Sequence, residues 1–424
     1  MKTNVIIFGI TGDLSRRKLI PALKQIRASG QAGELAIIGV SRREVAIKEL
    51  VGPELADSTT LVSMDLAEPA DYQKLYQAAH IGEGAHTVVY LSVPPLAVTQ
   101  IARLLGEAGF NVPGVKLLFE KPFGVDEASA KEMVAEVARY FDELAIYRID
   151  HYLAKEMAQN IVAFRATNAL FAHTWNREFI ESIEVVASET IGIEARTEFY
   201  EQTGALRDVL QGHLMQLLAL TILRVPDDLD WTLLPALRSE ALRQLAPAVP
   251  TESVRAQYDT YRQEVNNPKS QVETYVSVTL HSHDPAWDGV PFTLTTGKAL
   301  DQKTTEVRVH FRKSHDSQAN CLIFHIQPNE GVEIDLYAKR PGYDRELDRR
   351  SLTFGYPEDT TLPDAYEQVL VDAIRSKKSI FASGEEIVAS WHVLQPLLDA
   401  WGMESRPLLS YQSGAHIDDH FQPR

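Results

Sequence analysis

The chain has a single cysteine and fewer basic than acidic residues. Cys321 cannot form an internal disulfide, which excludes the disulfide-stapled secreted proteins and favours a reducing compartment. The 42 Lys and Arg stand against 58 Asp and Glu, giving a net charge of -16. This charge argues against non-specific nucleic acid binding, because a phosphate backbone attracts clustered basic side chains. An anionic substrate would therefore need basic residues gathered locally.

Long apolar runs, internal repeats and low-complexity tracts are also absent from the 424 residues. The longest apolar stretch, Leu214–Leu223, is about half the length that a membrane span needs. The N-terminal apolar run Val5–Phe8 leads into a glycine turn rather than a signal-peptide cleavage site. We therefore expect a soluble, cytoplasmic protein with no membrane partner. The length predicts about two or three domains.

The N-terminal segment has the order strand, tight turn, helix that a dinucleotide site requires. Val5–Phe8 is typical of a buried strand. After the turn, a helical segment runs to Ile26, and its regular helix is expected to begin near Pro21. Such a turn lets backbone N–H groups and the helix terminus meet a pyrophosphate. The spacing departs from the usual GxGxxG pattern, so this turn alone is a weak indication. The turn residues that we expect to bind the cofactor are Gly9, Thr11, Gly12, Asp13 and Leu14.

The second expected strand, Leu35–Val40, indicates which nicotinamide cofactor binds. It ends in Ser41-Arg42-Arg43, where an NAD site usually has an acidic residue for the ribose hydroxyls. Guanidinium groups suit a 2'-phosphate, which favours NADP; the alternative is two exposed loop arginines. A third strand, Thr60–Ser63, leads to Asp65, which could contact the adenine or cap a turn.

The fifth expected strand, Val115–Phe119, delivers Glu120-Lys121-Pro122 at its carboxyl end. Ligands bind at this edge in open α/β sheets, so Lys121 could reach both cofactor and substrate; the alternative is a solvated lysine. Two further strands, Thr87–Ser92 and Leu144–Arg148, also alternate with helices. The pattern predicts a doubly wound, α/β Rossmann-type dinucleotide-binding domain over residues 1–150.

Directly after this domain comes a polar stretch, Tyr147–Glu156. If the residues from Leu153 onward are helical, His151 and Lys155 stand four apart and share one face, which suits a phosphate dianion. Asp150 would then lie at the mouth of the helix. The alternative is a helix N-terminus that Asp150 caps, with solvated His and Lys side chains.

Residues 151–424 are expected to form an α+β domain with a large, mainly antiparallel sheet, because strand-like stretches follow one another without intervening helices. These stretches are Ile180–Ser188, Val272–Leu280, Phe292–Thr296, Val307–Phe311, Leu322–Gln327 and Val332–Ala338. A long helix is expected near 204–223, and helical structure again over 366–401. His213 lies in the first of these, where a lone histidine is most often a core residue. No periodicity brings it together with Glu189 or Lys298.

Several short motifs, taken together, closely resemble those of the glucose-6-phosphate dehydrogenase family. They occur in the family's order from about residue 5 to 400. The Asp-His-Tyr-Leu and Gly-Lys-Ala-Leu pieces are the most specific. The matching motifs are Gly12-Asp13-Leu14, Arg17-Lys18-Leu19, Glu120-Lys121-Pro122, Arg148–Leu153, Lys155-Glu156, Arg207-Asp208, His213-Leu214, Gly289–Phe292, Gly297–Leu300 and Ile326–Glu330.

The resemblance implies oxidation of glucose 6-phosphate at C1 to a lactone, with hydride transfer to NADP, in the pentose phosphate pathway. His213 matches the family's general base and Asp150 the carboxylate that pairs with it. No metal is expected, and a homodimer or homotetramer is implied. The residues matching substrate-binding positions are His151, Tyr152, Lys155, Glu189, Asp208, Lys298, Lys303, Lys121 and Gln327. Those matching cofactor-site positions beyond the turn are Lys18, Arg42, Asp65 and Lys121.

The chain also departs from the family pattern. Ala154 replaces a glycine, Gly212 replaces an asparagine, and 195–198 replaces a glycine-rich run. The region 43–65 is shorter than in most relatives. These departures affect sugar preference and cofactor selectivity, so two alternatives stay open. One is an NAD(P)-dependent dehydrogenase of another hexose 6-phosphate. The other is a silent paralogue that senses NADPH or sugar phosphate, although such a protein is expected to have lost the base or its carboxylate.

Overall fold

The computed structural model describes residues 2–42, 45–81, 86–194, 196–313, 318–357, 360, 362–403 and 408–417. The chain forms two compact units, and both are discontinuous in sequence. The first comprises Met1–Ala154, Trp231–Pro235 and Pro363–Ile387. The second comprises Lys155–Asp230, Ala236–Leu362 and Val388–Arg424. Three stretches of the range 151–424 thus belong to the first unit: 151–154, 231–235 and 363–387.

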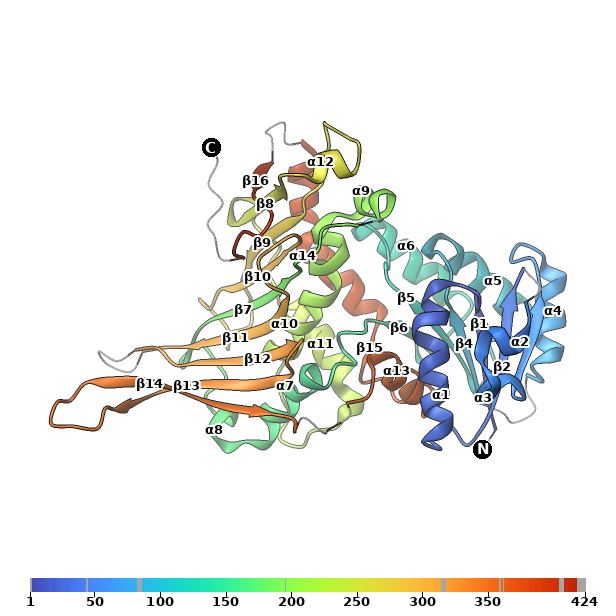
Figure 1. The fold of residues 1–424 in the computed structure, drawn as a ribbon, viewed down its shortest axis with the longest axis horizontal. Coiled ribbons are helices and arrows are strands. Elements are labelled where there is room, and N and C mark those ends of the chain that lie inside the picture. Colours follow the sequence, from blue (N-terminus) through green and yellow to red (C-terminus); the bar gives the residue numbers. More distant parts are fainter. Residues whose placement is uncertain are drawn as a thin grey trace. The chain divides into compact units, whose positions relative to one another are not determined.

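The first unit is built on a seven-stranded sheet with the order β15-β6-β5-β4-β1-β2-β3 (Figure 1). The six N-terminal strands are parallel, and β15 adds antiparallel to β6. This order confirms the predicted Rossmann-type domain. The strands are β1 (Lys2–Phe8), β2 (Glu34–Ser41), β3 (Thr59–Ser63), β4 (His86–Leu91), β5 (Val115–Glu120), β6 (Ile146–Ile149) and β15 (Phe381–Ala382).

Helices connect these strands. The π-helix η1 (Ser15–Leu19) leads into α1 (Ile20–Ala28), which begins beside Pro21 as expected. The apolar residues of α5 that face the core follow helical spacing, since Val98, Ile101 and Leu105 are all buried. The helix α13 (Ala365–Ile374), from the far end of the chain, packs against α1 (Figure 1). The remaining helices are α2 (Ile47–Val51), α3 (Pro53–Ala56), α4 (Pro69–Ala78), η2 (Pro95–Ala97), α5 (Val98–Glu107), α6 (Glu127–Ala138), η3 (Glu143–Ala145) and η5 (Trp231–Leu233).

The second unit is built on a nine-stranded sheet with the order β14-β13-β12-β11-β7-β10-β9-β8-β16. It is mainly antiparallel, as predicted, but β7 pairs parallel with β10 and β8 with β16. The sequence did not indicate β8, β14 or β16; in β14 nearly every residue is exposed, so no alternating pattern marks it. The strands are β7 (Ile180–Ser188), β8 (Ser253–Tyr258), β9 (Tyr275–Leu280), β10 (Phe292–Gly297), β11 (Thr304–Phe311), β12 (Cys321–Gln327), β13 (Gly331–Lys339), β14 (Leu347–Gly355) and β16 (Leu409–Tyr411).

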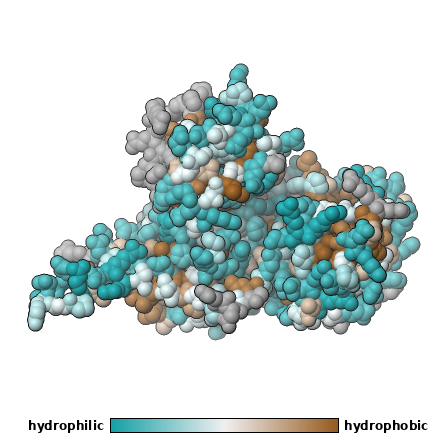
Figure 2. Space-filling view, viewed as in Figure 1, coloured by the Kyte–Doolittle hydropathy of each residue, from teal (hydrophilic) through white to brown (hydrophobic). Residues whose placement is uncertain are grey.

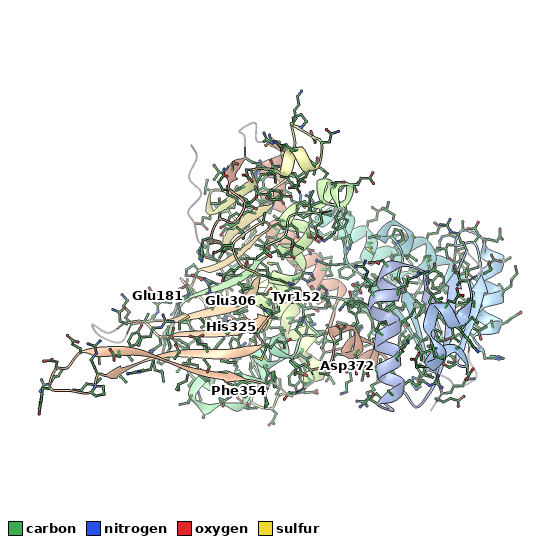
Figure 3. The ribbon with its side chains drawn as sticks, in the orientation of Figure 1. Tyr152, Glu181, Glu306, His325, Phe354 and Asp372 are labelled. Carbon is green, nitrogen blue, oxygen red and sulfur yellow. The ribbon has the colours of Figure 1, made fainter. Side chains whose placement is uncertain are left out.

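Helices cover one face of this sheet. Phe164 of α7 packs edge-on against Phe324 of β12, with ring centroids 5.5 Å apart. On neighbouring strands, Glu306 of β11 and His325 of β12 lie side by side (Figure 3), with Oε2 and Nδ1 3.1 Å apart. The tip of the β13–β14 hairpin is hydrophilic (Figure 2). The helices are α7 (Glu156–Thr167), α8 (Ala169–Ala172), α9 (Thr197–Ala205), η4 (Leu206–Leu214), α10 (Met215–Ile222), α11 (Leu234–Arg243), η6 (Pro250–Glu252), α12 (Tyr261–Glu264) and α14 (Gly384–Met403).

Across the described ranges, none of the helices combines the length and the apolar character that crossing a membrane requires.

Candidate active site

The turn after β1 brings backbone into close contact. Gly9 has a φ of 74°, and a Cβ atom there would lie 2.3 Å from the carbonyl oxygen of Ser92. The N–H of Gly12 donates to the Gly9 carbonyl at 2.9 Å, and the Ser15 hydroxyl donates to the same oxygen at 3.0 Å. Only glycine fits this position, because the Ser92 carbonyl occupies the place of a Cβ.

The register of the parallel strands brings the other predicted cofactor residues to the same edge. Phe8 lies opposite Val40 and Leu91, and Phe119 lies opposite Arg148. The residues that follow these strands, including Arg42, Lys121 and Asp150, therefore lie at one sheet edge together with Gly9. Arg42 is exposed there, and Arg43 is outside the described residues.

Other predicted cofactor residues have contacts of their own. Asp13 is exposed and pairs with Arg17, Oδ1 to Nε 2.8 Å, while Thr11 and Leu14 are partly buried. Asp65 is exposed, and its Oδ1 accepts from the N–H of Ala67 at 3.0 Å. Asp65 thus caps a turn, which was the alternative for this residue.

A buried hydrogen-bond network at the same edge was not predicted. The Tyr90 hydroxyl donates to Oε1 of Glu120 at 2.5 Å, and Tyr366 of α13 also bonds to this carboxyl group. Burial raises the pKa of Glu120 to about 7, against the lowering effect of its bond from Tyr90. Glu120 belongs to the Glu120-Lys121-Pro122 motif that the sequence analysis identified. Its place at the centre of this network depends on Tyr366, which α13 supplies.

Lys18 and His151 are also organised by α13 and its N-cap. Lys18 Nζ lies 2.9 Å from Oδ2 of Asp364 and 5.8 Å from the centroid of the Tyr366 ring. The His151 ring stacks on Tyr366 with centroids 6.2 Å apart. Because α13 lies more than two hundred positions away in sequence, no local pattern could have indicated these neighbours.

The helix expected from Leu153 onward is present but begins three residues later. The helix α7 begins at Glu156, and Lys155 precedes it in an extended conformation with ψ 135°. His151 and Lys155 therefore do not share a helix face. Asp150 does not cap α7, whose N-cap is Lys155; residues 151–154 form a turn, and the Oδ1 of Asp150 accepts from the N–H of Tyr152 within it at 3.0 Å. Here this side-chain bond stabilises the turn that precedes the helix. Ala154 is buried in this turn.

In the second unit the structure brings together three of the predicted substrate-binding residues. Glu189 follows β7 and Lys298 follows β10, and these two strands are the parallel pair, with Ser188 opposite Gly297. Lys298 Nζ contacts Oε2 of Glu189 and lies 3.7 Å from Oδ2 of Asp208. A parallel pair places two carboxyl ends side by side, which the expectation of antiparallel strands could not indicate.

Asp208 and His213 lie on η4, which is a π-helix where the sequence predicted the start of one regular helix. A π-helix bonds residue i to residue i+5, so Asp208 and His213 lie about one turn apart. His213 is buried, at 4% exposed. Gly204, at φ 65°, is not helical, so the predicted helix also begins later.

Two residues near Lys298 were not predicted. Lys298 Nζ lies 5.4 Å from the centroid of the buried Tyr200 ring, and Arg196 Nη2 lies 3.4 Å from Oδ1 of Asp208. Arg196 belongs to the altered run 195–198, whose first residue is outside the described residues.

The remaining substrate candidates of this unit are spread over other elements. The Gln327 amide donates to Thr305 Oγ1 at 3.2 Å, and Lys303 is exposed in the loop before β11. Lys155 lowers the pKa of Glu330, although burial raises that pKa overall.

Comparison with known proteins accounts for nearly the whole chain. The family model described as glucose-6-phosphate dehydrogenase, NAD binding domain, matches residues 6–160, and the corresponding C-terminal domain matches residues 162–420. Glucose-6-phosphate 1-dehydrogenase of Chlamydia muridarum is 34% identical, covering 97% of this chain and 92% of the relative. The Dickeya dadantii protein of the same name is 33% identical, covering 97% and 94%.

Solved structures agree. A glucose-6-phosphate dehydrogenase in complex with its substrate glucose 6-phosphate aligns with a TM-score of 0.90 at 28% identity, covering 98% of this chain and 95% of that one. A UDP-N-acetylglucosamine 3-dehydrogenase of Acidithiobacillus ferrooxidans aligns with a TM-score of 0.54 at 12% identity, so it shares the fold alone.

Proposed function

Because the chain belongs to the glucose-6-phosphate dehydrogenase family, we propose that it oxidises glucose 6-phosphate at C1 to 6-phosphoglucono-1,5-lactone, with NADP as hydride acceptor. This is the oxidative entry to the pentose phosphate pathway. The observation that carries the proposal is the contact of buried Lys298 with Glu189 and Asp208, in a chain that aligns with the family over almost its full length.

For the sugar, the two carboxylates are proposed to accept hydrogen bonds from hydroxyl groups, and Lys298 holds them in place while reaching the substrate. Charge-assisted bonds of this kind are the stronger ones, and they fix orientation. The proposed phosphate ligands are His151, Tyr152 and Lys155. Further proposed substrate contacts are Lys121, Lys303 and Gln327.

His213 is proposed as the general base, which takes the proton from the C1 hydroxyl. A histidine suits this step because its reference pKa of about 6.5 lies near neutral pH. Asp150 is proposed to orient the imidazole ring and to stabilise the imidazolium that forms. Proton removal by a histidine needs no metal ion.

The cofactor edge fits a dinucleotide. The tight turn at Gly9 connects β1 to η1 at the carboxyl edge of the sheet, and exposed Arg42 follows β2 where a 2'-phosphate would lie. NADP, when bound, supplies the acceptor for the hydride. The residues proposed to hold it are Gly9, Thr11, Gly12, Asp13, Leu14, Lys18, Arg42, Asp65 and Lys121.

The test is absorbance of the reduced nicotinamide with purified protein. Glucose 6-phosphate, free glucose and other hexose 6-phosphates are compared, each with NADP and with NAD. We expect the highest kcat/KM for glucose 6-phosphate with NADP. Higher turnover of another hexose 6-phosphate would contradict the substrate assignment, and a preference for NAD would contradict the cofactor assignment. No turnover with any pair would contradict the proposed reaction and favour the silent paralogue.

We also propose a homodimer or homotetramer that associates through the large sheet of the second unit, since helices pack on one face and the alternate residues of β12 are only partly buried. A cytoplasmic location is proposed from the single cysteine.

A further inference from the structure

A cavity of about 790 Å³ lies in the first unit, away from the cofactor edge. Its walls include His86 at the start of β4, Val115 and Lys116 at the start of β5, and Tyr147 near the start of β6. These are the amino ends of parallel strands, whereas Gly9 and Lys121 lie at the carboxyl ends. The six residues of β5 separate the two edges by roughly 17 Å at about 3.3 Å per residue.

Cationic side chains dominate the charged residues of this cavity. Lys116, Arg139 and Lys378 line it, against the single carboxylate of Asp142. Arg139 already has a partner in Glu136, with Nη1 and Oε1 2.6 Å apart on the exposed surface of α6. The cavity therefore has a positive balance in a chain whose overall charge is negative.

The ammonium groups of the two lysines donate to backbone carbonyl oxygens. Lys116 Nζ donates to the carbonyl oxygens of Ala373 and Ile374 at the end of α13. Lys378 Nζ donates to the Glu143 carbonyl and lies 5.1 Å from the centroid of the Tyr147 ring. In the part of the chain that the structure describes, neither ammonium group forms an ion pair with a carboxylate. Burial lowers the pKa of each lysine to about 8, although Glu143 and Glu386 act against this lowering at Lys378.

The other walls are suited to a flat apolar group. Tyr140, Phe141 and Tyr147 line the cavity together with Pro113 and Leu144. Nδ1 of His86 is buried and, among the described residues, has no hydrogen-bond partner. Small-molecule sites commonly combine such an apolar lining with a few polar groups, in volumes of about 300–1,000 Å³.

We propose that this cavity binds a nucleoside diphosphate. The diphosphate meets Lys116, Lys378 and Arg139, and the base lies against the aromatic walls. Three cations can balance the negative charge of a diphosphate, whereas a neutral sugar has no charge for them to balance. Lys116 and Lys378, whose ammonium groups donate to backbone carbonyl oxygens, gain a direct ion pair with the diphosphate.

The test is equilibrium dialysis of the full chain with ADP as probe, in the presence of saturating NADP so that the cofactor edge is occupied. We expect one saturable ADP site. Lys378→Gln and Arg139→Gln are each expected to weaken ADP binding at least 10-fold, by loss of a charged contact. Lys377→Gln is the matched control, because Lys377 is the exposed neighbour and does not line the cavity.

Three results would overturn the proposal. One is no saturable ADP binding, or displacement of ADP by NADP. Another is equal ADP affinity in the Lys378→Gln and Lys377→Gln proteins. The Arg139→Gln protein is compared with Lys377→Gln in the same way. Because Arg139 is exposed, its loss leaves the core intact. The third is inorganic pyrophosphate binding as tightly as ADP, which would mean that no base enters the cavity. Binding is measured without turnover, so failure here is separate from failure of the proposed reaction.

Discussion

At the scale of single residues, Lys298 shows how the fold holds a buried charge. The residue is 5% exposed, and its ammonium group contacts Glu189 and lies near Asp208. Buried charges are tolerated when they are paired, and removing one partner leaves the other uncompensated. The stability of this cluster should therefore depend on its members jointly.

A double-mutant cycle with Lys298→Met and Glu189→Gln tests this dependence. We expect a coupling free energy of about 1–3 kcal/mol in urea unfolding, because the side chains are in contact and the lysine is buried. The control cycle uses Lys131 and Glu127, an exposed pair on α6 with Nζ and Oε1 2.6 Å apart, for which about 0.5 kcal/mol or less is expected. Equal coupling in both cycles would contradict the argument.

His213 has a different role, since its proposed function is chemical. The change His213→Asn keeps a polar side chain of similar shape but removes the titratable base. We expect kcat to fall about 10²- to 10⁴-fold with the Kd for glucose 6-phosphate little changed. Stopped-flow turnover and equilibrium substrate binding measure the two quantities. An Asn variant with unchanged kcat would exclude His213 as the base.

At the scale of elements, the β1–η1 turn depends on a backbone conformation that only glycine adopts easily. Gly9→Ala would place a methyl carbon 2.3 Å from the Ser92 oxygen, at φ 74°. Gly30 has a similar φ of 69° but no atom within 4 Å of the Cβ position, so Gly30→Ala isolates the cost of the φ angle.

We expect Gly30→Ala to lower stability by about 1 kcal/mol and to leave cofactor binding unchanged. Gly9→Ala should cost more than that and weaken NADP binding at least 10-fold. Thermal unfolding and NADP titration by fluorescence provide the comparison. Similar behaviour of the two variants would show that the contact with Ser92 is unimportant.

The network of Glu120, Tyr90 and Tyr366 joins β5, β4 and α13, and it predicts a pH dependence. The pKa of Glu120 is about 7 in the folded protein, against an ordinary value of 4.5. Between pH 4.5 and 7 the folded protein therefore keeps a proton on Glu120 that the unfolded chain has lost. Stability from this group is therefore full below pH 4.5 and decreases as pH rises to 7, by up to about 3 kcal/mol.

Glu120→Gln should remove this component, so the free energy of unfolding should fall less between pH 4.5 and 7 than in the parent. Urea titrations at several pH values measure the slope. Glu107→Gln, an exposed residue of α5, is the control and should keep the parent slope. A parent-like slope in the Glu120→Gln protein would show that this carboxyl group does not titrate as described.

The elements that the sequence predicted well are those with strong local patterns. The strand Ile180–Ser188 was placed at its observed bounds, and the parallel strands of the first unit were found within one to three residues. The errors arose where side chains compete with backbone: Asp150 stabilises a turn, and α7 therefore starts later. The contact of Glu189 with Lys298 depends on a parallel strand pair, which no local pattern specifies.

At the scale of the whole molecule, the first unit needs a segment from the far end of the chain. Without Pro363–Ile387, β6 loses β15, and Tyr147 loses Phe381, whose ring centroid lies 4.7 Å away. Lys116 also loses its carbonyl acceptors at the end of α13. Truncation effects follow from such buried contacts rather than from position in the sequence.

We therefore expect a fragment of residues 1–154 to show no cooperative thermal unfolding by circular dichroism. In the full chain, Phe381→Ala should lower stability by about 3–5 kcal/mol while the transition stays cooperative. A fragment that unfolds in one sharp transition would show that the N-terminal strands suffice.

The pairing of β15 with β6 also has a consequence for synthesis on the ribosome. The N-terminal strands emerge first, but their sheet acquires its last strand only after residues 381–382 have been made. At about 5–20 residues per second, translation of the intervening chain takes roughly 10 to 40 s. Throughout that interval the backbone groups of β6 and the face of α1 that α13 covers are exposed. The segment made first is thus among the last to be completed, and it is the segment that a nascent-chain chaperone would have to protect.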